Sequence, residues 1–176
     1  MRGKKGVPHL DEEDPPRRRA NKAVGHGTWE RDRPPVCGAV GRDSGRARLH
    51  VEHRTDRATL ERVVGGSSRV GAMVYTDEWR SYDHLPEMGR GHATVCHTVG
   101  EWARDDDGDG IREVHDNTLE GMWTGLRNHL RIFRGVNKEY LHQYVAIFEW
   151  SYNVKQATPE FLRALLGIKP STNCRT

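Results

Sequence analysis

The stretch VHDNTLEGMWTGLRNHLRIFR, at residues 114–134, decides the fold that we expect from this sequence. Its apolar residues recur at helical spacing and predict one buried face of an amphipathic helix. The members of that face are Leu119, Met122, Trp123, Leu126, Leu130 and Phe133. Asn117 and Glu120 have the spacing of a capping box, in which the first side chain caps the helix and the second reaches back to it. The helix therefore begins near Asn117 and packs against the rest of the chain.

The polar side of this helix carries residues suited to bind metal ions and phosphate. At about 100° per residue, four of them fall within one narrow stripe and a fifth lies beside it. They are Glu120, Thr124, Arg127 and Arg131 in the stripe, and Asn117 next to it. A carboxylate, a carboxamide and two guanidiniums therefore project from one side of the helix.

A second informative stretch is VGAMVYTDEWRSY, at residues 70–82. Its short apolar run, residues 70–75, predicts a strand that is buried on both faces. The run ends at Thr76 and Asp77. In α/β sheets, ligands and catalytic groups sit at the carboxyl ends of strands. Asp77 is therefore a candidate site residue.

Composition bounds the class of protein. The 176 residues suffice for one domain with a real core, and 30% of them are charged against 7% aromatic. No apolar run approaches the ~18 residues of a membrane-spanning helix, and MRGKKGVPHL lacks the apolar region of a signal peptide. We therefore expect a cytoplasmic location and no membrane partner.

Arginine clustering and cysteine usage add two expectations. The formal net charge is only +3, yet the arginines cluster, which favours a polyanionic partner. The clusters contain Arg17 to Arg19 and Arg127, Arg131 and Arg134. The three cysteines, Cys37, Cys96 and Cys174, are odd in number, lie far apart and form no C-x-x-C pair. They predict buried, reduced thiols.

The chain divides into three parts by composition. Residues 1–35 hold five of the eight prolines and blocks of like charge, and predict an extended basic arm or a solvated segment. We expect residues 36–166 to form the folded domain and residues 167–176 to form a tail. Within the domain we expect strands in PVCGAVG and ARLHVEHR with a turn at Arg42 to Gly45, a helix in RATLERVV ended by Gly65 and Gly66, strands at 70–76 and in HATVCHT, and then helices. Asn137 caps one of these helices, and Thr158 with Pro159 starts the last one.

The two informative stretches together could form a two-metal site for phosphoryl transfer. Such a site needs carboxylates from different elements that converge on a pair of divalent ions. Asp77 and Glu120 could be two of them, with Asn117 supplying a neutral oxygen, because Mg²⁺ keeps several waters and needs few protein ligands. Arg127, two helical turns after Glu120, is suited to hold a phosphate. On spacing alone, Asp77 could equally be a turn residue and Glu120 a capping residue.

Three further positions lie close to these candidates in the sequence. His115 could orient a phosphate or a water, or make a hydrogen bond at the helix entry. Trp79 follows Asp77 by two residues and lies outside the strand, so we expect it to touch substrate. Trp123 points with the apolar face and is expected in the core.

The loop DDDGDGIREVHD, at residues 105–116, offers a competing motif. Residues of an EF-hand calcium loop are matched by Asp105, Asp107, Asp109, Gly110, the carbonyl of Ile111 and Asp116. However, Arg112 stands where the motif has an apolar residue, the last position is Asp instead of Glu, and no helix is predicted before the loop. A calcium-binding module is thus one function hypothesis, and a solvated acidic loop is its alternative.

Four blocks of the chain point to a family when they are taken together. They are VYTDEWRSYDHL, HATVCHT, VHDNTLEGMWTGLRN and RGVNKEYLHQYVAIFEWSYN. With these four blocks in this order, the chain resembles the catalytic domain of bacterial insertion-sequence transposases of the DDE superfamily. The resemblance is to the group with Asn or Glu as third catalytic residue. The resemblance runs from about Lys5 to about Ala164, and its T-D-E-W and H-x-N-T-x-E-G-x-W blocks are the most specific parts.

The resemblance implies an α/β, ribonuclease H-like fold, a mixed sheet flanked by helices, and DNA cleavage and strand transfer with two Mg²⁺ or Mn²⁺ ions. Water would attack at the element end, and the freed 3′-hydroxyl would attack target DNA. Asp77 matches the family's second catalytic Asp, Asn117 and Glu120 its third-position candidates, and Arg127 a basic residue that is usually Lys. From the residues themselves and the arginine clusters, we expect DNA contacts at a set of positions that comprises Arg127, Arg131, Arg134, Trp79 and His115. The implied partners are element ends, target DNA and, as an option, further copies of the chain.

One part of the family pattern is missing from this sequence. The family's first catalytic Asp lies on the first, central strand, and here MRGKKG occupies that place. Asp11, Asp14 and Asp32 could be offered as substitutes for this Asp, but none of them lies in a credible strand. The absent strand would leave two neighbours with unpaired backbone groups facing a gap. We therefore expect an amino-terminally truncated transposase domain that is inactive alone.

A non-catalytic DNA-binding remnant is the alternative function. It would use Arg127, Arg131, Arg134 and the arginine-rich arm on phosphates, and its binding to duplex DNA would be sensitive to salt. Metal-dependent nicking of DNA distinguishes the two hypotheses.

Overall fold

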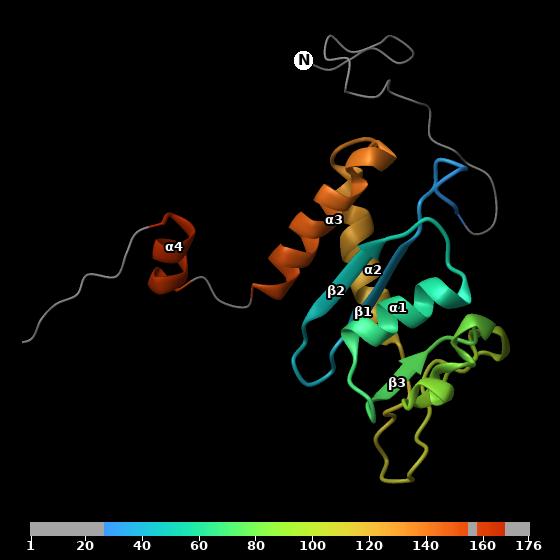
Figure 1. Ribbon diagram of the computed structural model, residues 1–176. Coiled ribbons are helices and arrows are strands. Elements are labelled where there is room, and N and C mark those ends of the chain that lie inside the picture. The colour runs from blue at the N-terminus through green and yellow to red at the C-terminus, as the bar shows by residue number, and fades with distance from the viewer. Residues whose placement is uncertain (1–26, 155–157, 168–176) are drawn as a thin grey trace, which may run out of the picture.

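The computed structural model describes residues 27–154 and 158–167 (Figure 1). Its principal elements are β1 Val36–Val40, β2 Ala47–Val51, α1 Arg57–Ser67, β3 Met73–Thr76, β4 Gly91–Thr94, α2 Asn117–Arg131, α3 Lys138–Asn153 and α4 Pro159–Leu165. Three 3₁₀ helices, η1 Arg80–Tyr82, η2 Leu85–Met88 and η3 His97–Val99, precede or follow β4. The order β, β, α, β, β and then helices is the predicted one. The first 26 residues with Asp11, Asp14 and Arg17 to Arg19, and the end of the tail with Cys174, lie outside the described residues.

Strands β1 and β2 form the predicted antiparallel hairpin. Val36 pairs with Val51 and Gly38 with Leu49. A Cβ added at Gly38 would lie 2.5 Å from Cδ2 of Leu49 and 3.2 Å from the Trp123 ring. Because both distances are shorter than ordinary van der Waals contact, glycine leaves the room that the Leu49 side chain on β2 and the Trp123 ring on α2 occupy.

Helices cover both faces of the hairpin (Figure 1). Helices α2 and α3 pack on one face, where the buried members of the core are Ala47, Leu49, Met122, Leu126, Val145 and Phe148. Helix α1 packs on the other face, where Leu60 and Val63 contact Cys37. Side chains of α3 also cover the outer edge of β2, because Asn153 bonds both backbone groups of Ala47 at 2.8 and 2.9 Å. The hairpin is therefore the centre of the described fold.

The buried face predicted for α2 is largely confirmed. Met122 and Leu126 are 2% and 4% exposed. Three other predicted members, Leu119, Trp123 and Leu130, pack against the same core. Phe133 is the exception, since it is 40% exposed. The helix ends at Arg131, so Phe133 no longer follows the helical period and contacts the Tyr144 ring instead.

Strands β3 and β4 form a separate, parallel pair. Met73 lies opposite Gly91 and Thr76 opposite Thr94. The prediction of a strand at 70–76 buried on both faces was wrong, because Val70 and Met73 are 78% and 55% exposed. Among the described residues β3 has a single strand neighbour, and the two strand pairs share no hydrogen bonds. The mixed α/β class is confirmed as two small sheets with helices.

Helix boundaries were predicted with mixed success. Asn137 caps α3 by accepting the N–H of Glu139 at 3.0 Å, and Thr158 caps α4. The predicted end of α1 at Gly65 and Gly66 was wrong, since the helix continues to Ser67. The buried guanidinium of Arg90 donates to the carbonyls of Gly65 and Ser68, which satisfies the carboxyl end of the helix.

Two expectations from the composition concern the cysteines and the membrane. Cys37 is a free, buried thiol, and burial raises its pKa to about 11. Cys96 is free and partly buried. Within the described part of the chain, no helix has the length and apolar character needed to cross a membrane.

Candidate functional site

The candidate site lies where the carboxyl ends of β3 and β4 meet the start of α2. Because the two strands are parallel and in register, the chain leaves both at the same edge, at Asp77 after β3 and at Val95 after β4. Nε2 of His97 then lies 3.3 Å from Oδ1 of Asp116, the residue before α2. This contact joins the edge that carries Asp77 to the helical turn that carries Glu120.

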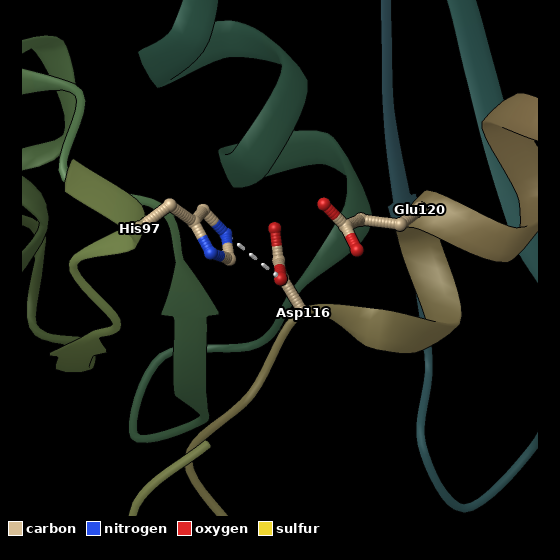
Figure 2. A group of neighbouring side chains, drawn as sticks. All are labelled: His97, Asp116 and Glu120. Atoms are coloured by element: carbon tan, nitrogen blue, oxygen red, sulfur yellow. Dashed lines mark ion pairs between the residues drawn. The ribbon is translucent and has the colours of Figure 1, made fainter. Parts of the chain in front are cut away.

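Three side chains cluster at this junction (Figure 2). Ligand atoms of His97, Asp116 and Glu120 all lie within 4.8 Å of one another. His97 and Asp116 are partly buried, and Glu120 is exposed at the mouth of the group. Of these three, Glu120 is a predicted site residue, His97 was given no role, and Asp116 was predicted as part of the calcium motif. Position in the VHDNT and HATVCHT blocks was the only available signal for the two missed residues.

The capping box predicted at the start of α2 was wrong. The helix does begin at Asn117, but Asp116 is its N-cap, and no side chain makes a capping bond there. The carbonyl of Asp116 accepts the N–H groups of Leu119 and Glu120 at 2.8 and 3.1 Å. As the first helical residue, Asn117 sits one position too late for its side chain to act as the cap. The Glu120 carboxylate is thereby left for the cluster with His97.

Glu78 ties the ends of the two parallel strands together. Its carboxylate accepts the N–H of His97 at 3.0 Å and both the N–H and the hydroxyl of Thr98, at 3.2 and 2.6 Å. These bonds, the Thr98 hydroxyl first, lower the pKa of Glu78 to about 2. Its neighbour Asp77 is exposed and accepts the N–H of Trp79 at 3.2 Å. Glu78 therefore fixes the backbone that presents both Asp77 and His97.

Arg42 connects the hairpin turn to the same junction. Its guanidinium lies 3.6 Å from the centre of the Tyr75 ring on β3. It also donates to the carbonyl oxygens of Glu113 and, at 2.6 Å, of His115. The carbonyl of His115 thus takes part in the helix entry, whereas Nδ1 of its side chain is buried without a hydrogen-bond partner among the described residues, so the role expected of that side chain stays a prediction. Nothing in the local sequence marked Arg42.

The acidic loop brings together three of the predicted calcium ligands but not the last one. Asp105, Asp107 and Asp109 do lie within 4.8 Å of one another. Asp105 accepts the N–H groups of Gly108 and Gly110, so the loop satisfies its own carboxylates. The predicted twelfth ligand, Asp116, contacts His97 instead. The EF-hand match was therefore wrong at its last position, and only the short η3 precedes the loop.

The remaining predicted site residues lie on the surface around the junction. Arg127 and Arg131 are exposed on α2, as the polar stripe predicts. Arg134 is exposed just beyond the helix and has a left-handed backbone, with φ of 55°. Trp79 is 40% exposed after β3. All four side chains are at least partly exposed, and their roles stay predictions.

Replacing Glu78 by glutamine is expected to lower the melting temperature of the chain. A carboxylate with a lowered pKa stabilises the fold above its ordinary pKa of 4.5, and loses that effect as the pH falls toward about 2. The difference in melting temperature from the parent chain should therefore be full above pH 5 and shrink progressively below it. Thermal unfolding between pH 7 and pH 3 measures this. Glu139→Gln, at another exposed glutamate, is the control, and an equal loss at every pH would contradict the role of the Glu78 charge.

Comparison with known proteins gives a family match. A family model described as ISXO2-like transposase domain matches residues 9–153. An uncharacterized protein in transposable element ISH50 of Halobacterium salinarum is 27% identical over 165 residues, which are 93% of this chain and 54% of that protein. An uncharacterized transposase-like protein of Haemophilus influenzae is 29% identical over 98 residues, which are 54% of this chain and 72% of that protein. The chain thus spans about half the length of the first relative, and no solved structure matches it.

Proposed function

The chain belongs to the ISXO2-like transposase domain family, and we propose that it is a catalytic domain for cleavage and strand transfer of insertion-sequence DNA. The observation that carries the proposal is the junction of β3, β4 and α2, which brings segments distant in sequence to one edge. Two of the segments carry the candidate carboxylates Asp77 and Glu120. Element ends, target DNA and further copies of the chain are the proposed partners, and a cytoplasmic location belongs to the same proposal.

The proposal includes a ribonuclease H-like fold. It is supported by the order of an antiparallel hairpin, a helix, a parallel strand pair and then helices. In that fold a central strand would join the two pairs. The described residues leave β1–β2 and β3–β4 as separate sheets, which agrees with a domain whose joining strand is not among them.

The candidate ligands supply some of the oxygen donors that two divalent ions need. Asp77 and Glu120 are exposed carboxylates, and Asn117 is an exposed carboxamide, so hydrated Mg²⁺ or Mn²⁺ could bind them through few contacts. Such ions would activate the attacking oxygen and stabilise the leaving one. Arg127 would hold a backbone phosphate in bidentate fashion, and its exposed side chain leaves it free to do so. Trp79 and His115 would contact the DNA near the same edge.

We expect the chain to be inactive in DNA cleavage when it is alone. The family pattern requires a further carboxylate on the central strand, and the described residues place no strand between the two pairs. Asp32, one of the considered substitutes, lies in a turn and forms an ion pair with Lys138 at 3.0 Å. The carboxylates of Asp77 and Glu120 alone would then leave the ions underligated.

Nicking of supercoiled plasmid DNA tests the proposal. The 176-residue chain is expected to bind the plasmid and to leave it intact with either Mg²⁺ or Mn²⁺. Metal-dependent nicking that Asp77→Asn abolishes, and that Asp107→Asn in the acidic loop preserves, would contradict inactivity while supporting the catalytic assignment. Absence of both binding and nicking would contradict the function itself.

A DNA-binding remnant without catalysis is the second candidate function. It is favoured by three exposed arginines, Arg127, Arg131 and Arg134, at and beyond the end of α2. Binding without nicking is compatible with both candidates. Recovery of metal-dependent nicking when a segment bearing the central strand is added would favour the catalytic domain, and its failure would favour the remnant.

A further inference from the structure

We infer that His97, Asp116 and Glu120 form a mixed nitrogen and oxygen site that binds one divalent transition-metal ion in preference to Mg²⁺. The inference deepens the proposed function and rests on it for the role of Glu120 near the DNA. It differs from the two-metal pattern, because the imidazole and Asp116 take the place of Asp77 around Glu120. Mn²⁺ is the probe for this site.

The three ligands come from two segments that only the fold brings together. His97 lies in η3 after β4, whereas Asp116 and Glu120 are four residues apart across the first turn of α2. Residues at this spacing project to the same side of a helix. The imidazole faces the two carboxylates across a short gap (Figure 2). One ion in that gap can contact all three, since their ligand atoms lie within 4.8 Å.

The two inner atoms of the group are Nε2 of His97 and Oδ1 of Asp116, and the distance between them fits a shared metal ion. Two donors that are each about 2.1 Å from one metal ion, at an angle of about 90–110°, lie about 3.0–3.4 Å apart. Nε2 of His97 and Oδ1 of Asp116 are 3.3 Å apart. Glu120 is exposed, so the third side of the group is open to solvent and to an entering ion.

The inner atoms lack other partners. Both nitrogens of His97 and Oδ1 of Asp116 are buried and make no hydrogen bond among the described residues. A neutral imidazole lone pair directed at a carboxylate oxygen is repelled by it, so a cation or a proton is needed between them. A bound metal ion satisfies both atoms at once.

The imidazole is held in position before any ion arrives. Its backbone N–H is bonded to Glu78 at 3.0 Å, which fixes the start of η3. Its ring packs on Trp102, with the ring centres 4.8 Å apart. Preorganised ligands lose less conformational entropy when they bind, so this arrangement favours affinity.

The donor types set the metal preference. Mg²⁺ prefers oxygen ligands in octahedral geometry and gives up its waters reluctantly. Imidazole nitrogen is a better ligand for transition metals than for Mg²⁺, and Mn²⁺ is the transition metal that carboxylate oxygen suits. Asp77 is not a member of the group and is engaged with the N–H of Trp79. The site should therefore discriminate between the two ions without Asp77.

Metal titration of the full chain without DNA tests the inference. We expect isothermal titration calorimetry to show Mn²⁺ binding at least about tenfold tighter than Mg²⁺. His97→Ala and Asp116→Asn should each weaken Mn²⁺ binding at least about tenfold, an effect of the size known for the surroundings of metal sites. In NMR spectra, Mn²⁺ should broaden the ring signals of His97 and leave those of exposed His142 on α3 sharp.

Matched variants separate the site from other acidic groups and from misfolding. Asp107→Asn, in the acidic loop, should leave the tight Mn²⁺ binding unchanged. His97→Gln, whose melting temperature without metal is compared with the parent, shows whether the loss of binding is a loss of fold. Equal affinity for Mn²⁺ and Mg²⁺, or retention of tight Mn²⁺ binding in a folded His97 variant, would overturn the inference. Because no DNA is present, these outcomes are independent of the plasmid assay, which tests the proposed function by itself.

Discussion

Simultaneous replacement of Arg127, Arg131 and Arg134 by alanine is expected to make the binding of duplex DNA much less sensitive to salt. Each phosphate contact contributes about 0.9 to the slope of log affinity against log salt. Three lost contacts reduce the slope by about 2.7, so the loss of affinity between 50 and 200 mM salt becomes about 40-fold smaller. Fluorescence anisotropy of a labelled duplex over that salt range measures the slope.

The geometry of α2 explains why these arginines should act together. Arg127 and Arg131 are four residues apart, so they lie on one side of the helix, and Arg134 follows at its end. All three are exposed, and none forms an ion pair within the described residues. Binding of a polyanion to them therefore breaks no ion pair between described residues.

A control with the same change of charge distinguishes a local surface from the total charge. Arg46, Arg69 and Arg112 are exposed but scattered over the hairpin turn, the end of α1 and the acidic loop. Their triple replacement by alanine should change the slope by far less. Equal slopes for the two triple variants would refute a DNA-binding stripe on α2, and an unchanged slope in the first would refute phosphate contacts there.

Local sequence signals predicted most of the elements. The turn at Arg42 to Gly45 and the flanking apolar alternation were enough for the hairpin. The apolar spacing of α2 and the caps Asn137 and Thr158 were enough for the helices. These signals work because hydrogen bonds and side-chain periodicity within a few residues decide them.

Tertiary contacts decided what the sequence could not predict. Helix α1 passes Gly65 and Gly66 because Arg90, 25 residues away from Gly65, satisfies its carboxyl end. The apolar sequence of β3 predicts a buried strand, yet the exposure of its side chains depends on how many strands flank it. The N-cap of α2 is Asp116, one residue from the predicted cap, and helix boundaries commonly shift by this much.

The candidate site shows the same division. Glu120 and Asp77 could be named, because helical phase and the end of a strand place them. Glu78, His97 and Arg42 were given no role, because their contacts join residues 19 and 73 positions apart. Sequence therefore indicated the chemistry of the site, and the fold supplied the residues that hold it together.

The second large effect is expected from Leu126→Ala, which should lower the free energy of unfolding by about 2–5 kcal/mol. Leu126 is 4% exposed and belongs to the core between α2, α3 and the hairpin. Removing its side chain loses buried apolar area and leaves a cavity that the packed neighbours Met122 and Phe148 can only partly fill. Urea unfolding followed by circular dichroism measures the change.

Thr124→Ala, two residues earlier on the exposed side of α2, is the matched control and should change the free energy of unfolding by about 0.5 kcal/mol or less. If Leu126→Ala costs no more than Thr124→Ala, α2 does not dock on the hairpin as described. That outcome would also detach Glu120 from His97, because the same docking places the first turn of α2 beside η3. A large loss in Leu126→Ala alone ties the stability of the hairpin core to the position of the candidate site.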